Sequence, residues 1–299
     1  MRRNVFVPYD ERNQDYGNSG NANFGRFRLG DYAVLPDGRK YRFTLNDGTV
    51  EVAGRLYQSV LGIPDHLNVT ADVARAIDAV IVSATLGATL AAIDIYAEGV
   101  VHINDVTGEG YTYRIRRANT AGAAHAAAAA SGILTVNLEA GEMLQVALDT
   151  TSQVTFTRNR FHAVLIHPSP PTAPLAGVSP GVAAVNRFYW SQVEGFAAVL
   201  GDGTLLEGLP VQASITTDGA VENKKLRVRT GSTTTAASGA GAILEDQDGT
   251  ETATARLSNT AVDTTYDISG PILINAPVVG MCVKVNVTGD ESLIDLRID

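Results

Sequence analysis

Residues 133–138 read Ile133-Leu-Thr-Val-Asn-Leu138, with leucine or valine at every second position. A period of two is that of a β-strand with one buried and one exposed face. The same alternation, parted by Gly, Asp and Asn, predicts seven more short strands: Ile77–Ala84, Ala92–Tyr96, Val100–Asn104, Tyr111–Arg116, Met143–Leu148, Val154–Thr157 and Val164–Ile166. Eight short strands predict an all-β sandwich or barrel domain over residues 61–167.

A second β domain is expected after a proline-rich segment. Pro168-Ser-Pro-Pro-Thr-Ala-Pro174 holds four prolines, which favour an extended backbone and remove ladder donors. We therefore expect a linker at residues 168–180 and a second antiparallel β domain at 181–299. The strands predicted there are Val182–Val185, Phe188–Val193, Ala197–Leu200, Leu205–Leu206, Val211–Ile215, Leu226–Val228, Ala242–Leu244, Ala253–Leu257, Ile272–Ile274, Cys282–Val287 and Leu293–Ile298.

Residues 1–60 are expected to form an extended N-terminal arm and a hairpin. The polar run Tyr9–Asn23 offers little to a core, whereas Tyr41-Arg-Phe-Thr-Leu45 alternates after the turn Pro36-Asp-Gly-Arg39. A polar arm beside aromatic and basic residues can become ordered on a neighbouring molecule, although a frayed terminus is the simpler alternative. The candidate interface residues are Tyr9, Tyr16, Phe24, Arg26, Phe27, Arg28, Arg39, Tyr41 and Trp190, and for Trp190 a core position is the alternative.

Composition and charge narrow the function classes. The 299 residues are 45% hydrophobic and 18% charged, with a net charge of −9. Residues 1–60 carry nine Lys or Arg against seven Asp or Glu, and the rest of the chain is acidic. An acidic body disfavours general binding to nucleic acid or to anionic membranes. The start of the chain lacks the apolar stretch of a signal peptide, so we expect synthesis and folding in a cytoplasm.

Residues that carry chemistry are sparse. No P-loop, no His-Glu-x-x-His helix and no Gly-x-Gly-x-x-Gly occur, and Cys282 is the only cysteine. The five histidines, at positions 66, 102, 125, 162 and 167, are scattered, and an odd spacing would turn His162 and His167 to opposite faces of a strand. We therefore expect no metal, no cofactor and no catalytic residues.

Two polar turns could each bind a ligand, although a simple turn is the favoured interpretation of both. Asp246, Asp248 and Glu251 surround a glycine and could hold calcium, although a solvated turn explains them as well. Asp105 and Glu109 precede Tyr111-Thr-Tyr113, a layout that suits either a hairpin turn or a loop on which a sugar ring stacks.

Short motifs, most of which contain Gly, Tyr or Asp, occur along the chain: Tyr16-Gly-Asn-Ser-Gly20, Gly30-Asp-Tyr-Ala-Val-Leu-Pro-Asp-Gly-Arg39, Gly54-Arg-Leu-Tyr-Gln-Ser59, Glu98-Gly-Val-Val-His-Ile-Asn-Asp105, Tyr189-Trp-Ser-Gln-Val-Glu-Gly195 and Val283-Lys-Val-Asn-Val287. Together they resemble virion structural proteins of tailed bacteriophages that infect aquatic bacteria. The resemblance implies a β-rich capsid decoration or cement protein, often a homotrimer, which binds the major capsid protein on the outer surface of the virion and bridges neighbouring capsomers. It brings no catalytic residues with it.

Three rival functions remain at this stage. A tail, baseplate or adhesin module with a carbohydrate-binding role is the first. A glycan depolymerase would require two carboxylates facing each other in one cleft, and distant strands could supply them. The major shell protein is disfavoured, since no long amphipathic run is available for a spine helix.

Overall fold

The computed structural model describes residues 5–6, 27–117, 124–224, 278–286 and 289–298. Within these ranges the chain is all-β, and its sheets are antiparallel apart from the pair β1–β2, so the predicted fold class is confirmed. The only helical turn described is the 3₁₀ turn η3 (Pro64–His66). Tyr9–Asn23, the calcium candidates and the strands predicted between 226 and 274 lie outside the described residues.

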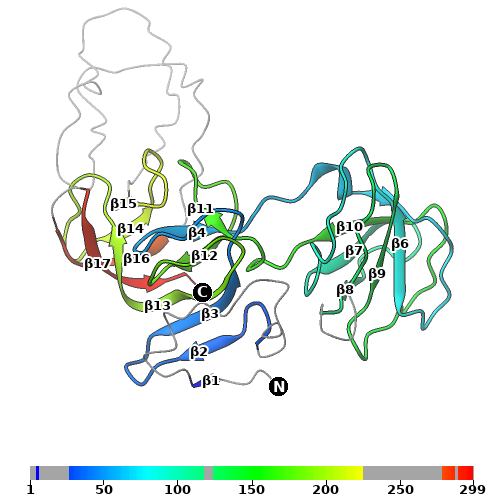
Figure 1. Ribbon diagram of the computed structural model, residues 1–299, viewed down its shortest axis with the longest axis horizontal. Coiled ribbons are helices and arrows are strands. Elements are labelled where there is room, and N and C mark those ends of the chain that lie inside the picture. Colours follow the sequence, from blue (N-terminus) through cyan, green and yellow to red (C-terminus); the bar gives the residue numbers. More distant parts are fainter. Residues whose placement is uncertain (1–4, 7–26, 118–123, 225–277, 287–288, 299) are drawn as a thin grey trace, which may run out of the picture.

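The strands gather into two bodies (Figure 1). The large body is one curled 11-stranded sheet with a main path and a branch. Its main path runs β1 (Val5–Phe6), β2 (Tyr32–Val34), β3 (Lys40–Leu45), β13 (Phe188–Leu200), β17 (Glu291–Arg297), β16 (Val278–Lys284), β14 (Pro210–Ala213) and β15 (Val221–Asn223). The branch joins β11 (Leu165–Ile166), β4 (Leu56–Gln58) and β12 (Leu175–Val178) to β13.

The long strand β13 holds the large body together. Its first half pairs with β3, from Phe188 opposite Leu45, and its second half pairs with β17, ending at Leu200 opposite Glu291. The predicted strands Phe188–Val193 and Ala197–Leu200 are therefore one. The ladder with β3 shifts register between Gln192 and Glu194, and Gly195 next to it takes a φ of 84°, a conformation that disfavours side chains with a Cβ.

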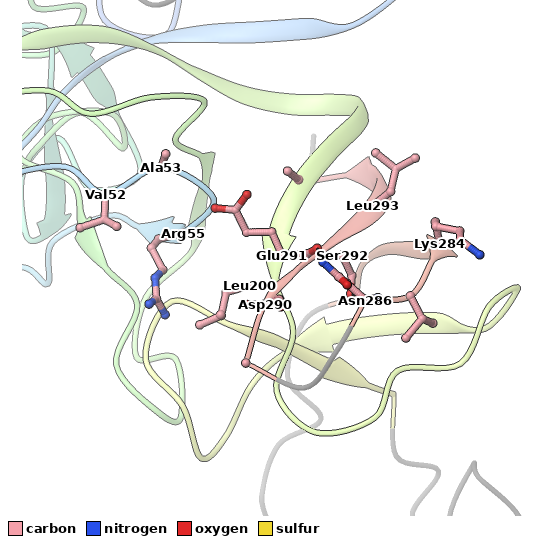
Figure 2. Close-up of a pocket in the computed structure, with 13 residues that line it drawn as sticks. Val52, Ala53, Arg55, Leu200, Lys284, Asn286, Asp290, Glu291, Ser292 and Leu293 are labelled. Carbon is pink, nitrogen blue, oxygen red and sulfur yellow. Dashed lines mark hydrogen bonds between the residues drawn. The ribbon is translucent and has the colours of Figure 1, made fainter.

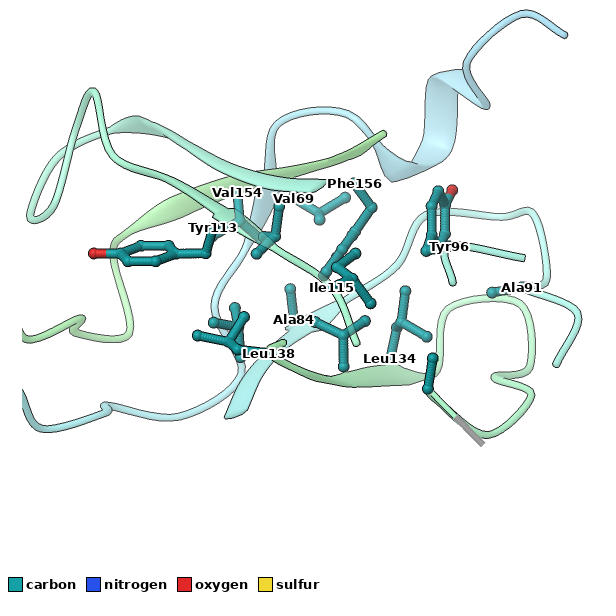
Figure 3. Packing of buried hydrophobic residues seen from close by; sticks show 14 of the residues in the cluster. Val69, Ala84, Ala91, Tyr96, Tyr113, Ile115, Leu134, Leu138, Val154 and Phe156 are labelled. Atoms are coloured by element: carbon teal, nitrogen blue, oxygen red, sulfur yellow. The ribbon is translucent and has the colours of Figure 1, made fainter. Parts of the chain in front are cut away.

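The small body, residues 64–157, is a sandwich of two sheets. One sheet is ordered β5 (Val69–Thr70), β10 (Gln153–Thr157), β7 (Val100–Asp105) and β8 (Thr112–Arg114), and the other pairs β6 (Ile81–Thr85) with β9 (Ile133–Asn137). Figure 3 shows side chains of both sheets meeting in a common core, among them Ile115, Leu134 and Phe156. The alternation Leu134, Val136, Leu138 thus faces inward, as the period of two predicts.

The pairing of strands corrects the predicted domain boundaries. The small body is an insertion in the large one, because β4 and β11 on either side of it pair directly, with Gln58 opposite Leu165 and Tyr57 opposite Ile166. The segments 1–60 and 181–299 thus contribute to one sheet rather than to separate units. The hairpin cannot stand alone, since Tyr41 and Phe43 of β3 are buried against the rest of that body.

The expected linker and four predicted strands were also wrong. Residues 168–180 contain β12, which begins directly after Pro174, the last proline that would interrupt a ladder. Ala92–Tyr96, Met143–Leu148, Val182–Val185 and Leu205–Leu206 are turns and loops. The β-bridges at or next to the first two regions, such as Ala91 with Ala128 and Arg75 with Leu148, are isolated, so the apolar spacing there serves packing without a ladder.

Candidate interaction surfaces

Three of the predicted interface residues lie in the core. Phe27, Tyr41 and Trp190 are buried in the large body. Trp190 packs edge-on against Phe27 and Phe43, with ring centroids 5.1 Å apart in both pairs. Trp190 is therefore a core residue, as the alternative reading had it, and these aromatic rings are not exposed for contact with a partner.

Of the other six interface candidates, two lie among the described residues and four do not. Arg28 contacts Glu139 of the small body at 3.0 Å, and Arg39 contacts Asp37 at 2.6 Å in its own turn. Tyr9, Tyr16, Phe24 and Arg26 lie outside the described residues. Arg28 thus belongs to the junction between the two bodies rather than to an outer surface.

A buried ionic junction fixes the two bodies to each other. The Glu98 carboxylate of the small body accepts a hydrogen bond from the Leu29 amide at 2.7 Å and lies 3.5 Å from the Arg117 guanidinium. Arg117 also donates to the Phe27 carbonyl at 2.8 Å. Burial raises the pKa of Glu98, against the opposing effects of the Leu29 amide and Arg117. Because these contacts are directional, they set one relative orientation of the bodies.

The exposed apolar residues of the small body include a group on two adjacent loops, which we name the apolar tip. It comprises residues 86–93 and 126–133, neither of which contains a charged residue. Leu90, Ile93 and Ile133 are 59%, 62% and 54% exposed. Exposed alanines lie between them at positions 88, 92, 126, 127, 129 and 130. Exposed apolar residues gathered on neighbouring loops are typical of interaction sites, so the tip is a candidate for one.

Backbone hydrogen bonds hold the tip in one conformation. Ala91 and Ala128 exchange both their amide and carbonyl hydrogen bonds at 2.9 Å. The Leu86 amide donates to the Gly132 carbonyl at 2.9 Å, and the Ser131 amide donates to the Gly87 carbonyl at 2.7 Å. The tip is therefore preorganised, which lowers the entropy cost of binding.

Beneath the tip lies a polar cluster that sequence reasoning missed. His66 and His125 are buried on either side of Tyr96, although the sequence suggested scattered histidines. Of the others, His102 contacts Thr112 on the surface, His167 bonds the Ala220 carbonyl, and burial lowers the pKa of His162 to about 4. No local sequence motif predicts the His66–Tyr96–His125 cluster, because the three residues are about 30 positions apart and come together only in the folded chain.

The large body has its own exposed apolar surface, the outer sheet face. Phe196, Asp295 and Met281 form one row across β13, β17 and β16, and Ala198 pairs with Leu293 in the next. Phe196 is 56% exposed and Met281 42%. A shallow groove of about 750 Å³ borders this face, between the loop that carries Val52 and Arg55 and the strands that carry Leu293 and Lys284 (Figure 2).

A carboxyl group is buried close to this loop. Glu51 is only 1% exposed, and burial raises its pKa to about 8. Hydrogen bonds with the Tyr57 and Tyr189 side chains lower this pKa, but by less than burial raises it. The Tyr57 hydroxyl accepts a hydrogen bond from the Val52 amide at 2.8 Å, which fixes the loop above it. Glu51 is therefore a structural acid that is largely protonated at neutral pH.

The candidate sugar-binding loop is a hairpin turn that carries one exposed ring. Tyr111 is 41% exposed and stacks on the buried Tyr113, with centroids 6.2 Å apart and planes within 8°. Asp105 and Glu109 are both exposed at the same turn. The arrangement offers an aromatic platform with carboxylates beside it, which is compatible with sugar binding.

Gly177-Val-Ser-Pro-Gly181 matches the nucleophile pattern Gly-x-Ser-x-Gly, and sequence reasoning overlooked it. Ser179 is buried at the end of β12, and its hydroxyl donates to the Gly181 carbonyl at 2.6 Å. A nucleophile elbow requires an exposed serine between a strand and a helix, and β12 leads into no helix. Ser179 is thus a turn residue.

Comparisons with known proteins add no relative: no family model, no curated protein and no solved structure matches the chain. Among the residues that the structure describes, no three His, Cys, Asp or Glu side chains are grouped to hold a metal ion. The same residues include no helix long and apolar enough to cross a membrane.

Proposed function

We propose that the chain is a structural virion protein that decorates the outer surface of a bacteriophage head and bridges neighbouring capsomers. The observation that carries the proposal is the preorganised apolar tip, in which Leu90 and Ile93 are more than half exposed on a rigid, uncharged pair of loops. The motifs that resemble phage virion proteins supply the choice of partner. The work proposed is burial of surface, without catalysis and without a cofactor.

Bridging requires two surfaces at a fixed separation, and the two bodies offer them. The apolar tip lies on the small body, and the outer sheet face with Phe196 and Met281 lies on the large body. The Glu98 junction restricts their relative movement. When a first contact holds the second near its target, two modest contacts give an avidity well above either affinity.

The partners follow from this role. We propose the major capsid protein as the partner of the apolar tip, and a second or third copy of the chain, as in a homotrimer, at the outer sheet face. A stable interface buries on the order of 1,000 Å² or more in total, and symmetry repeats the gain in every copy. Nucleic acid and membranes are not proposed as partners.

The decisive experiment mixes the purified chain with undecorated heads and counts the bound copies. We expect saturable binding and a higher melting temperature of the shell. Leu90→Asp with Ile93→Asp should weaken binding at least about a hundredfold, because a charge replaces each apolar contact. Leu61→Asp, an exposed residue outside the tip, is the matched control. Unchanged binding of the tip variant would rule out the tip as the capsid contact.

The exposed Tyr111 ring favours one second candidate, a carbohydrate-binding tail or adhesin module. In that case Tyr111→Ala should abolish binding to host-cell glycans, and the chain should associate with tails instead of heads. Val106→Ala at the same turn is the matched control, because it removes exposed apolar surface but no ring. Glycan binding that survives Tyr111→Ala would contradict this candidate.

A further inference from the structure

The two loops of the apolar tip rest on a chain of hydrogen bonds through three buried side chains. His66 Nε2 lies 2.9 Å from the Thr89 carbonyl of the first loop, and its Nδ1 lies 2.5 Å from the Tyr96 hydroxyl. His125, at the base of the second loop, is linked to the backbone of Tyr96 and to the Ala126 carbonyl. His66, Tyr96 and His125 are each at most 1% exposed.

The hydrogen bonds fix the proton of His125. The Tyr96 backbone amide can only donate, and it points at His125 Nε2 at 3.0 Å. Nε2 must therefore be an unprotonated acceptor. The Ala126 carbonyl can only accept, so Nδ1, at 2.8 Å, carries the proton. His125 is thus neutral in the Nδ1–H form, and the Thr89 carbonyl fixes His66 in the opposite, Nε2–H form.

Protonation affects the two histidines differently. At His66, a proton on Nδ1 would meet the Tyr96 hydroxyl, which can rotate and accept it. At His125, a proton on Nε2 would meet the Tyr96 N–H, and two donors would face each other in a buried site. A backbone amide cannot rotate away, so this hydrogen bond must break.

We propose that His125 is an acid-sensitive lock on the apolar tip, and that protonation of its Nε2 separates it from the Tyr96 amide and frees the loops at 86–93 and 124–133. At neutral pH the lock holds the tip in its binding conformation. The importance of the lock for capsid binding rests on the function proposed above, whereas the lock itself does not.

The charged and titratable groups around His125 act in both directions. Burial lowers its pKa from the usual 6.5, and His66 adds to that effect, whereas the Asp94 carboxylate opposes it. The Asp94 carboxylate also accepts a hydrogen bond from the Ala124 backbone amide at 2.6 Å, so it anchors the loop that carries His125. The Arg158 charge acts on Tyr96 and His162. The Asp65 carboxylate accepts a hydrogen bond from the Thr89 hydroxyl on the first loop.

The direction of the pH effect follows from these groups. The locked form holds His125 neutral, whereas the opened loop lets it titrate near 6.5. Protons therefore favour the open form, and opening becomes easier as pH falls below about 6.5 until it reaches the lowered pKa of the locked form. Because one proton is involved, the equilibrium constant for opening can change by at most about tenfold per pH unit.

The test is hydrogen exchange of the full chain between pH 7.5 and 4.5, corrected for the intrinsic rate. We expect protection in residues 86–93 and 124–133 to fall by up to about tenfold per unit below pH 6.5, while β7 and β10 stay protected. His125→Gln can still accept from the Tyr96 amide but does not titrate, so the pH effect should disappear. His102→Gln, on the surface of the same body, should keep it.

Nitrogen NMR of histidine in the unmodified chain provides a second test that needs no variant. At pH 7.5 it should show His125 protonated at Nδ1 and His66 at Nε2. The proposal is overturned if His125 carries its proton on Nε2, if loop protection does not change down to pH 4.5, or if His125→Gln opens with the same pH dependence. All readouts use the free chain, so a failure of the tip to bind heads would sink the proposed function alone.

Discussion

The two bodies bury different polar groups beside different cores. The small body buries the hydrogen-bonded side chains of His66 and His125, together with the junction acid Glu98, beside a largely aliphatic core. The large body buries an acid, Glu51, and has an aromatic core in which the rings of Phe27 and Phe43 lie edge-on to Trp190. Burial lowers the pKa of His125 in the small body and raises the pKa of Glu51 in the large body. The His125 contribution is therefore lost as pH falls below about 6.5, whereas the Glu51 contribution is lost as pH rises from about 4.5 to about 8.

The aromatic core should give the largest effect and should separate the two bodies. Trp190→Ala removes a fully buried ring that contacts Phe27 and Phe43, and should cost the large body about 3–5 kcal/mol. In scanning calorimetry we expect its transition to move down while that of the small body stays. Phe196→Ala on the same strand, where the ring is exposed, is the control. An equal shift of both transitions would mean that the bodies unfold as one.

The buried acid should make the large body less stable as the pH rises from about 4.5 to about 8. Glu51 has a pKa of about 8 in the folded chain against 4.5 in the unfolded one, so its contribution is fully favourable below pH 4.5 and is lost as pH rises through about 8. The slope is at most about 1.4 kcal/mol per pH unit. Glu51→Gln should flatten it in urea titrations at several pH values. Glu109→Gln, an exposed carboxylate in the small body, should leave the slope in place.

The junction should have a smaller effect on stability and a clear one on coupling. Glu98→Ala removes the acceptor of the buried Leu29 amide and the partner of Arg117, at a cost of about 2 kcal/mol. We expect the two calorimetric transitions to move apart and small-angle scattering to report a broader range of shapes. If the scattering curve stays the same, other contacts set the orientation of the bodies.

The partly exposed ion pair of the junction should matter least. Arg28 and Glu139 lie 3.0 Å apart, but the Arg28 side chain is 38% exposed, so Glu139→Ala should cost less than about 1 kcal/mol. The loss should shrink further in high salt, where surface charges are screened. A larger, salt-independent cost would show that this pair is as important as the Glu98 contacts.

Much of the fold could be predicted from local sequence, because alternating apolar and polar residues indicate a strand with one buried face. It identified the regions of β7, β9, β10 and β17. It failed at Ala92–Tyr96, where apolar residues line loops, and it could not reveal that β4 and β11 pair across the whole small body.

The candidate surfaces were harder to predict. Phe27, Tyr41 and Trp190 fit an interface by sequence because aromatic residues are common there, yet aromatic residues are also common in cores. Leu90 and Ile93 gave no signal, because an exposed leucine and a buried one look alike in sequence. His66 and His125 reach Tyr96 only through long-range packing, which no spacing rule describes.

The direct pairing of Gln58 with Leu165 has a consequence for how such a chain can change over generations. Neighbouring strands lie about 4.8 Å apart, so the ends left by removal of the small body could be rejoined by a tight turn. The small body can therefore behave as a cassette, gained, lost or exchanged by recombination while the host sheet keeps its ladder. Related chains that share the sheet could carry different cassettes, each with its own exposed surface.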